Sequence, residues 1–291
     1  MNQILSRAIR SRVPRRVRNW LKSPRQSYYW LEEELRYWAG ACPTIQIRAD
    51  WTLKCHPTAY RLIRENQICD PAQKKELDGF IDSLVPGCIV FDIGAHFGVF
   101  SLAALRFGGK DARVIAVDPS PTSVRMLAIQ SQLNDLASDR LQIIQASVGE
   151  HAGEQNMVSV GVIGGGYFVV PEKTHSAIDF TKTISTTVDH LVRKTQRRPT
   201  HLKIDVEGAE KAVLHGATNT LTAPQAPILF LELHNALIRR RGDEPEKVLD
   251  LLEDFGYIIR RSSPEAVTRE SLLAPDIIRL MASKDIGERT N

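Results

Sequence analysis

The chain has 291 residues, of which 43% are hydrophobic and 25% charged, so it is long enough for one large or two modest globular domains. Its net charge of +4 is unevenly spread: residues 1–26 hold eight Lys and Arg and no acid, which leaves −4 on the rest and disfavours a nucleic-acid-binding core. No stretch of about 18 uncharged apolar residues is present and the four cysteines lack metal-ligand spacing, so we expect no membrane span and no zinc site, but a cytoplasmic protein with reduced thiols.

Residues 1–42 are predicted to form a basic arm followed by an aromatic helix. The arm lacks the apolar core of a signal peptide. Its charge is expected either to attract the periphery of an anionic membrane or a polyanionic glycan, or only to keep the arm solvated. Over residues 27–38, SYYWLEEELRYW, aromatic residues and leucines fall largely at helical spacing. They predict a helix that packs on the body of the protein or on a partner.

Residues 43–85 are predicted to be a β/α extension. The runs TIQIR at 44–48 and YRLIR at 60–64, separated by a proline, indicate one or two strands. Residues 74–84, KKELDGFIDSL, have the pattern of an amphipathic helix that is closed by a following Pro-Gly pair.

The chain is organised around the stretch 88–105, CIVFDIGAHFGVFSLAAL. It predicts a buried strand that ends at Asp92, a tight turn between Gly94 and Gly98, and the start of a helix. Glycine permits the sharp reversal and lets the backbone approach a ligand closely. Because the first amide groups of a helix carry partial positive charge, a small anionic or nucleotide-like ligand is expected beside this turn.

The turn differs from the dinucleotide-binding fingerprint, because His96 and Val99 stand where G-x-G-x-x-G requires glycine. A nicotinamide-dependent oxidoreductase on a similar sheet is therefore the weaker functional alternative. Asp118 ends the next predicted strand, 20 residues after Gly98. Its carboxylate can accept hydrogen bonds from both hydroxyls of a ribose, or, with the following proline, it can simply start a helix.

The remaining elements follow from apolar runs and turn signals: a helix over 122–133, a strand over 141–146, an inserted hairpin over 157–160 and 167–170, an edge strand running into a short helix over 182–192, a helix over 246–255, and strands over 257–260 and 277–281. Between them, HLKIDVEGAEKAVLHGA predicts a strand that ends at Asp205 and one helix from Gly208 through Ala217, with Glu210 as a first-turn acid that complements the helix dipole. The apolar run PILFLELH predicts a central parallel strand.

This alternation predicts a doubly wound α/β protein with a mostly parallel sheet, which binds ligands at the carboxyl ends of its strands. Polar residues lie at or just after five predicted strand ends: Asp92, Asp118, Ser147, Asp205, Glu207, Glu232 and His234. The fold is therefore expected to gather them at one site.

The sequence resembles the FkbM-type family of S-adenosylmethionine-dependent methyltransferases in three places. These are VFDIGAHFGVFS, the Asp118-Pro119 pair, and LKIDVEGAEKAVLHGA followed by LELH. The resemblance covers about residues 86–281, and the KIDVEGAE block is its most specific part. It implies a class I methyltransferase sheet of seven strands with the last antiparallel, in a domain over 86–285 that precedes a tail over 286–291. It also implies methylation of a hydroxyl on a sugar, glycan or other small metabolite. His96 departs from the family, which commonly has asparagine there.

The resemblance, matched to the parts of S-adenosylmethionine, assigns the methionine end to Asp92, Gly94, Ala95, Gly98 and Ser101, the ribose to Asp118, the adenine to Ser147, and the region of the methyl group to Asp205. For catalysis, His234 is the first candidate general base, because imidazole titrates near neutral pH, and Asp205 and Glu207 are the next. Alternatively, Asp205, Glu232 and His234 hold Mg²⁺ or Mn²⁺, which would lower the pKa of the acceptor hydroxyl. The acceptor and the oligomeric state stay open.

Overall fold

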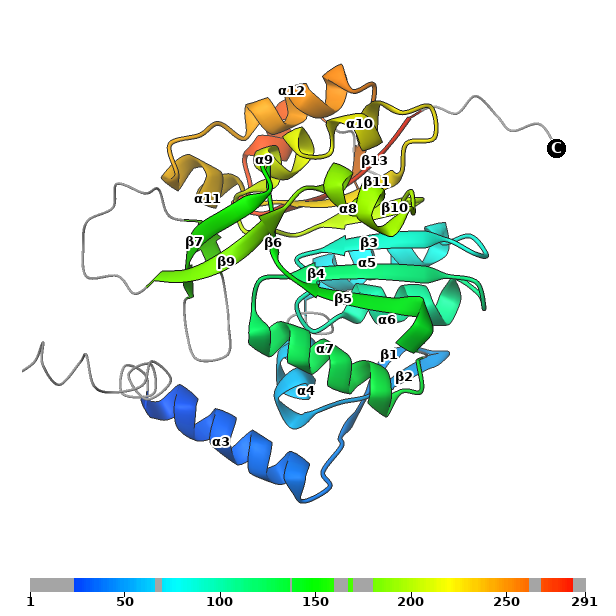
Figure 1. Cartoon of the computed structure of the whole chain (residues 1–291), viewed down its shortest axis with the longest axis vertical. Coiled ribbons are helices and arrows are strands. Elements are labelled where there is room, and N and C mark those ends of the chain that lie inside the picture. The colour runs from blue at the N-terminus through cyan, green and yellow to red at the C-terminus, as the bar shows by residue number, and fades with distance from the viewer. Residues whose placement is uncertain are drawn as a thin grey trace, which may run out of the picture.

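A computed structural model describes residues 24–65, 70–136, 138–159, 167–169, 180–261 and 268–284 of the chain. Most of the basic arm and the predicted tail over 286–291 lie outside these residues. Seven strands form one sheet in the order β12-β13-β11-β10-β3-β4-β5 (Figure 1). Their bounds are β3 Ile89–Ile93, β4 Arg113–Asp118, β5 Leu141–Gln145, β10 His201–Ile204, β11 Ile228–Leu233, β12 Ile258–Arg261 and β13 Ile278–Ser283.

The sheet is mostly parallel, as the sequence predicted. Strands β5, β4, β3, β10 and β11 pair in parallel, whereas β13 is antiparallel to both β11 and β12. Consecutive residues of β4 alternate between two cores: Val114 belongs to one, and Ile115 to the other. Because both faces of the strand are buried, the run is continuously apolar rather than alternating with polar residues.

Helices cover both faces of the sheet (Figure 1). One core includes residues of α5 Pro71–Ser83, α6 Val99–Phe107 and α7 Pro121–Leu133, and the other includes residues of α8 Val188–Thr195, α9 Glu210–His215, α10 Thr218–Thr222, α11 Asn235–Arg240, α12 Glu246–Asp254 and α13 Arg269–Leu273. The helix predicted from Gly208 through Ala217 is wrong in extent, because α9 ends before Gly216. A Cβ on Gly216 would lie 2.1 Å from the carbonyl oxygen of Gly149, so the backbone of another segment packs directly against the break between α9 and α10.

The N-terminal extension packs on the same core as α5 and α6. It consists of α3 Pro24–Trp38, the antiparallel pair β1 Thr44–Arg48 and β2 Trp51–Lys54, and α4 Pro57–Ile63. The prediction of a strand over YRLIR is wrong, because these residues belong mostly to α4. Pro57 occupies its first turn, and the Nδ1 atom of His56 accepts a hydrogen bond from the Thr58 backbone amide and caps the helix.

A second sheet of four strands has the order β6-β9-β7-β8. Its strands are β6 Ser147–Val148, β7 Gly153–Ser159, β8 Tyr167–Val169 and β9 Phe180–Thr186. The predicted hairpin is confirmed as the antiparallel pair β7 and β8. The predicted edge strand is wrong in its placement, because β9 lies between β6 and β7 and pairs with both. This sheet continues from the carboxyl end of β5, so it stands beside the site described next.

Candidate active site

A cavity of about 290 Å³ lies at the carboxyl ends of the central strands. It is lined by most of the residues that the sequence singled out: Asp92, Gly94, Ala95, Gly98, Asp118, Ser147, Asp205, Glu207 and Glu232. Parallel neighbours end at the same edge of a sheet, which is why strands far apart in the sequence deliver these side chains to one place.

Two of the singled-out residues, Ser101 and His234, do not line the cavity. Ser101 is fully buried in α6, and its Oγ donates a hydrogen bond of 2.6 Å to Oδ2 of Asp92. Burial raises the pKa of the Asp92 carboxyl, and this hydrogen bond partly opposes the rise. Ser101 therefore orients Asp92 from behind.

The glycines of the turn are required by packing within the protein. Gly94 has φ = +80°, and a Cβ there would lie 1.7 Å from the carbonyl oxygen of Asp205. A Cβ on Gly98, also left-handed, would lie 2.0 Å from Cδ1 of Leu127 in α7. The glycines thus let the turn fit tightly between Asp205, which follows β10, and α7, while the close approach of a ligand stays a prediction.

Asp118 is held rigidly at the end of β4. Its Oδ2 accepts a hydrogen bond of 2.9 Å from the His96 amide, and its Oδ1 accepts one of 2.8 Å from the Ser120 amide. Burial nevertheless raises the pKa of Asp118 to about 6. His96 is one of four non-glycine residues with left-handed φ in the described chain, and its ring stacks on Phe97 at 3.9 Å. Each Asp118 oxygen keeps a second lone pair that can accept a further hydrogen bond.

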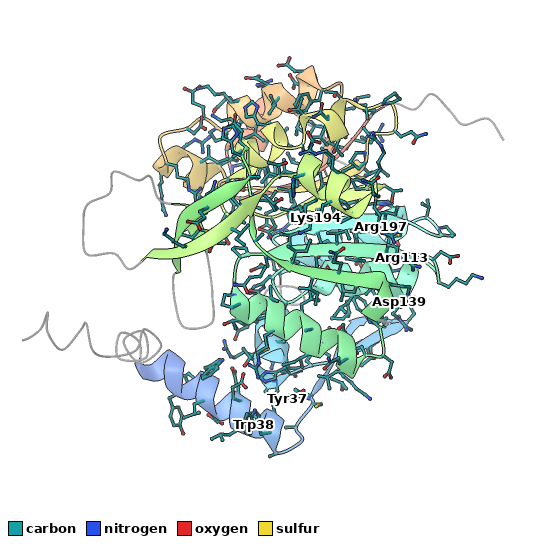
Figure 2. All side chains as sticks on the ribbon, viewed as in Figure 1. Tyr37, Trp38, Arg113, Asp139, Lys194 and Arg197 are labelled. Atoms are coloured by element: carbon teal, nitrogen blue, oxygen red, sulfur yellow. The ribbon has the colours of Figure 1, made fainter. Side chains whose placement is uncertain are left out.

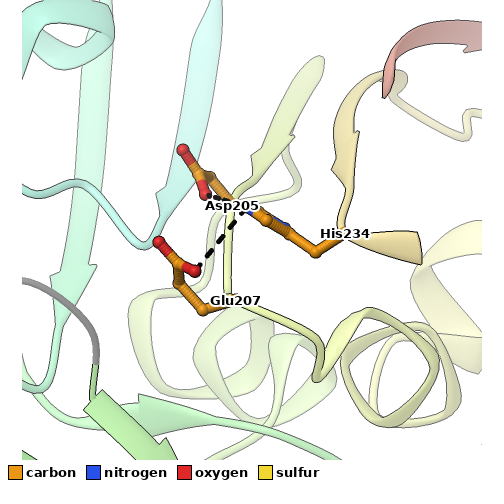
Figure 3. A group of neighbouring side chains, drawn as sticks. All are labelled: Asp205, Glu207 and His234. Carbon is orange, nitrogen blue, oxygen red and sulfur yellow. Dashed lines mark ion pairs between the residues drawn. The ribbon is translucent and has the colours of Figure 1, made fainter. Parts of the chain in front are cut away.

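The carboxylates of Asp205 and Glu207 line one side of the cavity, which we call the acidic wall. Nε2 of His234 lies 3.8 Å from Oδ1 of Asp205 and 3.8 Å from Oε2 of Glu207 (Figure 3). Glu207 is also in the left-handed region, with φ = +56°. A strained backbone that aims a carboxylate into a cavity is typical of functional sites, because such strain persists only where the surrounding structure enforces it.

Behind this wall lies a residue that the sequence analysis treated as a mere complement to a helix dipole. Glu210 is fully buried, and its Oε1 lies 2.7 Å from Nδ1 of His234 and accepts a hydrogen bond of 3.0 Å from the Gly208 amide. Burial would lower the pKa of His234, but Glu210, together with Asp205 and Glu207, raises it to about 9. This pKa lies above the near-neutral value expected from the sequence, so the surrounding carboxylates favour the protonated imidazole.

A second buried charge network was missed by sequence reasoning. Lys203 of β10 lines the cavity, and its Nζ lies 3.0 Å from Oε1 of the fully buried Glu76 in α5. Glu232 lies 4.0 Å from the same Nζ and accepts a hydrogen bond of 2.9 Å from Arg279. In the sequence, the feature that could have indicated this network is a lysine within the apolar run of a buried strand. Glu232 also lies 3.8 Å from Nε2 of His234, but among the described residues the group whose ligand atoms all lie within 4.8 Å of one another is Asp205, Glu207 and His234, and not the predicted set with Glu232.

The order of the seven strands, the antiparallel β13 and the cavity at the carboxyl ends are those expected of the class I methyltransferase sheet. The sequence model of the methyltransferase FkbM domain matches residues 92–259. This chain therefore belongs to the FkbM methyltransferase family.

Individual proteins resemble the chain more distantly. Ribosomal protein L11 methyltransferase of Pelotomaculum thermopropionicum is 34% identical over 79 residues, which cover 27% of this chain and a quarter of that protein's length. The solved structure of methyltransferase FkbM from Methylobacillus flagellatus aligns with a TM-score of 0.44 at 15% identity, over 77% of this chain and 58% of that one. Ribosomal protein L11 methylase from Lactobacillus delbrueckii aligns with a TM-score of 0.43 at 14% identity, over 73% and 78%.

Proposed function

We propose that the protein transfers the methyl group of S-adenosylmethionine to a hydroxyl oxygen of a small acceptor such as a sugar. The observation that carries this proposal is the pair of carboxylates, Asp205 and Glu207, on the cavity wall. A hydroxyl is a poor nucleophile until its proton is removed, so methylation at oxygen needs a positioned base. Burial raises the pKa of Asp205 above its ordinary value, which makes it a stronger base than an exposed aspartate.

The cavity suits the cofactor in shape and charge. Its volume of about 290 Å³ is near the lower end of the usual range for ligand pockets. Asp92 and the turn from Gly94 to Gly98 would hold the methionine end, the free lone pairs of Asp118 the ribose, and Ser147 the adenine. When bound, S-adenosylmethionine supplies an electrophilic methyl group on a positively charged sulfur, and the carboxylate of Asp205 favours that charge.

The residues of the acidic wall divide the work. Asp205 or Glu207 would accept the hydroxyl proton, since both line the cavity. His234 lies behind them with a raised pKa, so it acts as a positioning residue whose positive charge opposes the rise that burial causes in the pKa of Asp205. We therefore propose Asp205 or Glu207 as the general base in place of His234, which was the first candidate from the sequence. Glu210 in turn holds the imidazolium in place through Nδ1.

A divalent cation on Asp205, Glu207 and His234 is the alternative use of the same wall, and Mg²⁺ or Mn²⁺ would suit its oxygen atoms. Nε2 of His234 can bind a metal only after losing its proton, and the raised pKa opposes that loss. We therefore favour direct proton transfer. Activity that survives extensive dialysis against a chelator would support it, and activity that needs added Mg²⁺ or Mn²⁺ would support the metal-assisted route.

The test of the proposed function is transfer of a deuterium-labelled methyl group from S-adenosylmethionine to a panel of acceptors. The panel should hold free sugars, glycosides and hydroxy acids together with amines and the ribosomal protein L11. Mass spectrometry detects the added methyl group, and NMR of the product identifies the methylated atom. A labelled O-methyl ether supports the proposal. Methylation of a nitrogen, with no product from any hydroxyl compound, refutes it.

A further inference from the structure

The helix α3 has two unlike sides. Its inner side carries Trp30, Glu33, Glu34 and Tyr37, at the spacing of one helical face, and both glutamates are buried. A second row, Tyr28, Leu31, Leu35 and Trp38, is exposed by 64%, 47%, 60% and 80% respectively. We call this row the outer stripe. The helix thus packs on the body mainly through its acids, while most of its large apolar side chains face solvent.

Ion pairs explain why the acids lie inside. Oε1 of Glu33 accepts a hydrogen bond of 2.7 Å from Nε of Arg61 in α4. Both oxygens of Glu34 accept hydrogen bonds, of 2.6 and 2.7 Å, from the two terminal nitrogens of Arg125 in α7. Such bidentate pairs fix geometry as well as adding energy. The rotation of α3 about its axis is therefore set by these contacts.

The aromatic residues at the end of the helix show the consequence. The Tyr37 ring packs on the buried His56 ring, with centroids 4.4 Å apart, whereas the next residue, Trp38, is the most exposed large apolar side chain described. Figure 2 labels both of them at the C-terminal end of α3. A row of four exposed apolar side chains along one helix is a contiguous patch, and such patches mark interaction sites.

The sequence next to α3 points to the partner. Eight Lys and Arg and no acid lie within residues 1–26, a range that precedes α3 and includes its first three residues. We infer that α3 lies flat on an anionic lipid surface, with the outer stripe among the acyl chains and the basic residues on the headgroups. Tyrosine and tryptophan are enriched at the boundary between membrane and water, and a cluster of four to eight basic residues beside an amphipathic helix is typical of proteins that bind anionic lipids.

The same charges disfavour a second copy of this chain as the partner. Pairing two outer stripes in parallel would bring two sets of eight positive charges together, whereas an anionic surface attracts them. The binding would be interfacial, because none of the described helices is long and apolar enough to cross a bilayer.

Membrane binding through α3 would also orient the catalytic cavity. Helix α4 contacts α3 through Arg61 and Glu33, and its next two residues, Leu62 and Ile63, line the cavity. One short helix thus connects the inner side of α3 to the cavity wall. The cavity would be held near the lipid surface.

The experiment measures sedimentation of the full-length protein with vesicles of phosphatidylcholine, with and without phosphatidylglycerol. Leu31→Glu/Leu35→Glu places two charges in the outer stripe, at positions that are exposed and so tolerate the change. Val85→Glu, at a residue exposed by 50% outside α3, is the matched control. Binding of S-adenosylhomocysteine by all three proteins reports that the fold is intact.

The wild type and Val85→Glu are expected to bind vesicles that contain phosphatidylglycerol and to be released by salt. The double variant should bind them roughly tenfold more weakly, or worse, because its apolar insertion is lost. Equal binding by the double variant would overturn the inference, since the basic residues would then act alone. Absence of vesicle binding by the wild type would also overturn it, as would a dimer that the double variant disperses without any lipid.

Discussion

The exchange of Glu210 for glutamine tests the reasoning about the acidic wall most directly. Glu210→Gln keeps the size of the side chain but removes the charge that lies 2.7 Å from Nδ1 of His234. In the wild type the pKa of His234 is raised from its ordinary 6.5 to about 9. At 1.36 kcal/mol per pKa unit, the protonated imidazole contributes on the order of 3 kcal/mol to the free energy of unfolding.

The sign of the pH dependence follows from the raised pKa. The contribution is fully present below pH 6.5 and is lost as the pH rises through about 9. The variant should lack most of it, so the difference in free energy of unfolding between the two proteins should be largest near pH 6 and shrink towards pH 10. Urea titrations across this range measure it. Glu270→Gln, an exposed first-turn acid of α13, is the control and should differ little from the wild type at any pH.

The pH–rate profile of the same variant separates the two candidate bases. If Asp205 accepts the proton, loss of the neighbouring imidazolium raises the pKa of its carboxyl, and the acidic limb of kcat/KM moves to higher pH. If His234 itself is the base, loss of Glu210 lowers its pKa, and the limb moves to lower pH. A limb that moves down, or a stability profile parallel to that of the wild type, would refute our account.

Three other substitutions test separate parts of the site. Asp118→Ala should weaken the binding of S-adenosylhomocysteine by about 1–3 kcal/mol through lost buried hydrogen bonds, and an unchanged affinity by calorimetry would remove Asp118 from the ribose site. Glu207→Gln should lower kcat by roughly 10²–10⁴ if Glu207 is the base, with little change in cofactor affinity, and near-normal turnover at every pH would leave Asp205 as the only carboxylate candidate. Gly94→Ala should reduce the free energy of unfolding by roughly 2–4 kcal/mol, because the added Cβ would meet the Asp205 carbonyl oxygen. The control is Gly242→Ala, at a matching φ of +79° but with open space around it, which should reduce the free energy of unfolding by about 1 kcal/mol in urea denaturation. Equal losses would show that backbone strain alone governs both sites.

Local sequence patterns were sufficient to predict the strands whose ends form the candidate active site. The mainly apolar runs that end at Asp92, Asp118 and Asp205 predicted β3, β4 and β10, because strands buried on both faces are mostly apolar. The glycine turn and the KIDVEGAE block carried the resemblance that the family match confirmed. The positions of the polar residues at one edge of the sheet followed from the parallel topology itself.

Local patterns misled where distant residues decide the outcome. The run YRLIR has the composition of a strand, but a capping His56 and a proline in the first turn make it helical. The aromatic stretch of α3 has an apolar pattern that usually faces a core, yet Glu34 turns inward because Arg125, 91 residues away, supplies its partner.

The sequence by itself determined most of the strands and helices, the family, and most of the polar residues that meet at the cavity, because periodicity and motif spacing are properties of neighbouring residues. Only the tertiary structure decided how those residues are ionised and oriented. The raised pKa of His234 depends on Glu210, 24 residues earlier, and the buried Lys203 depends on Glu76, 127 residues earlier. Electrostatic energy depends on distance in space and on burial, and neither is contained in the spacing along the chain.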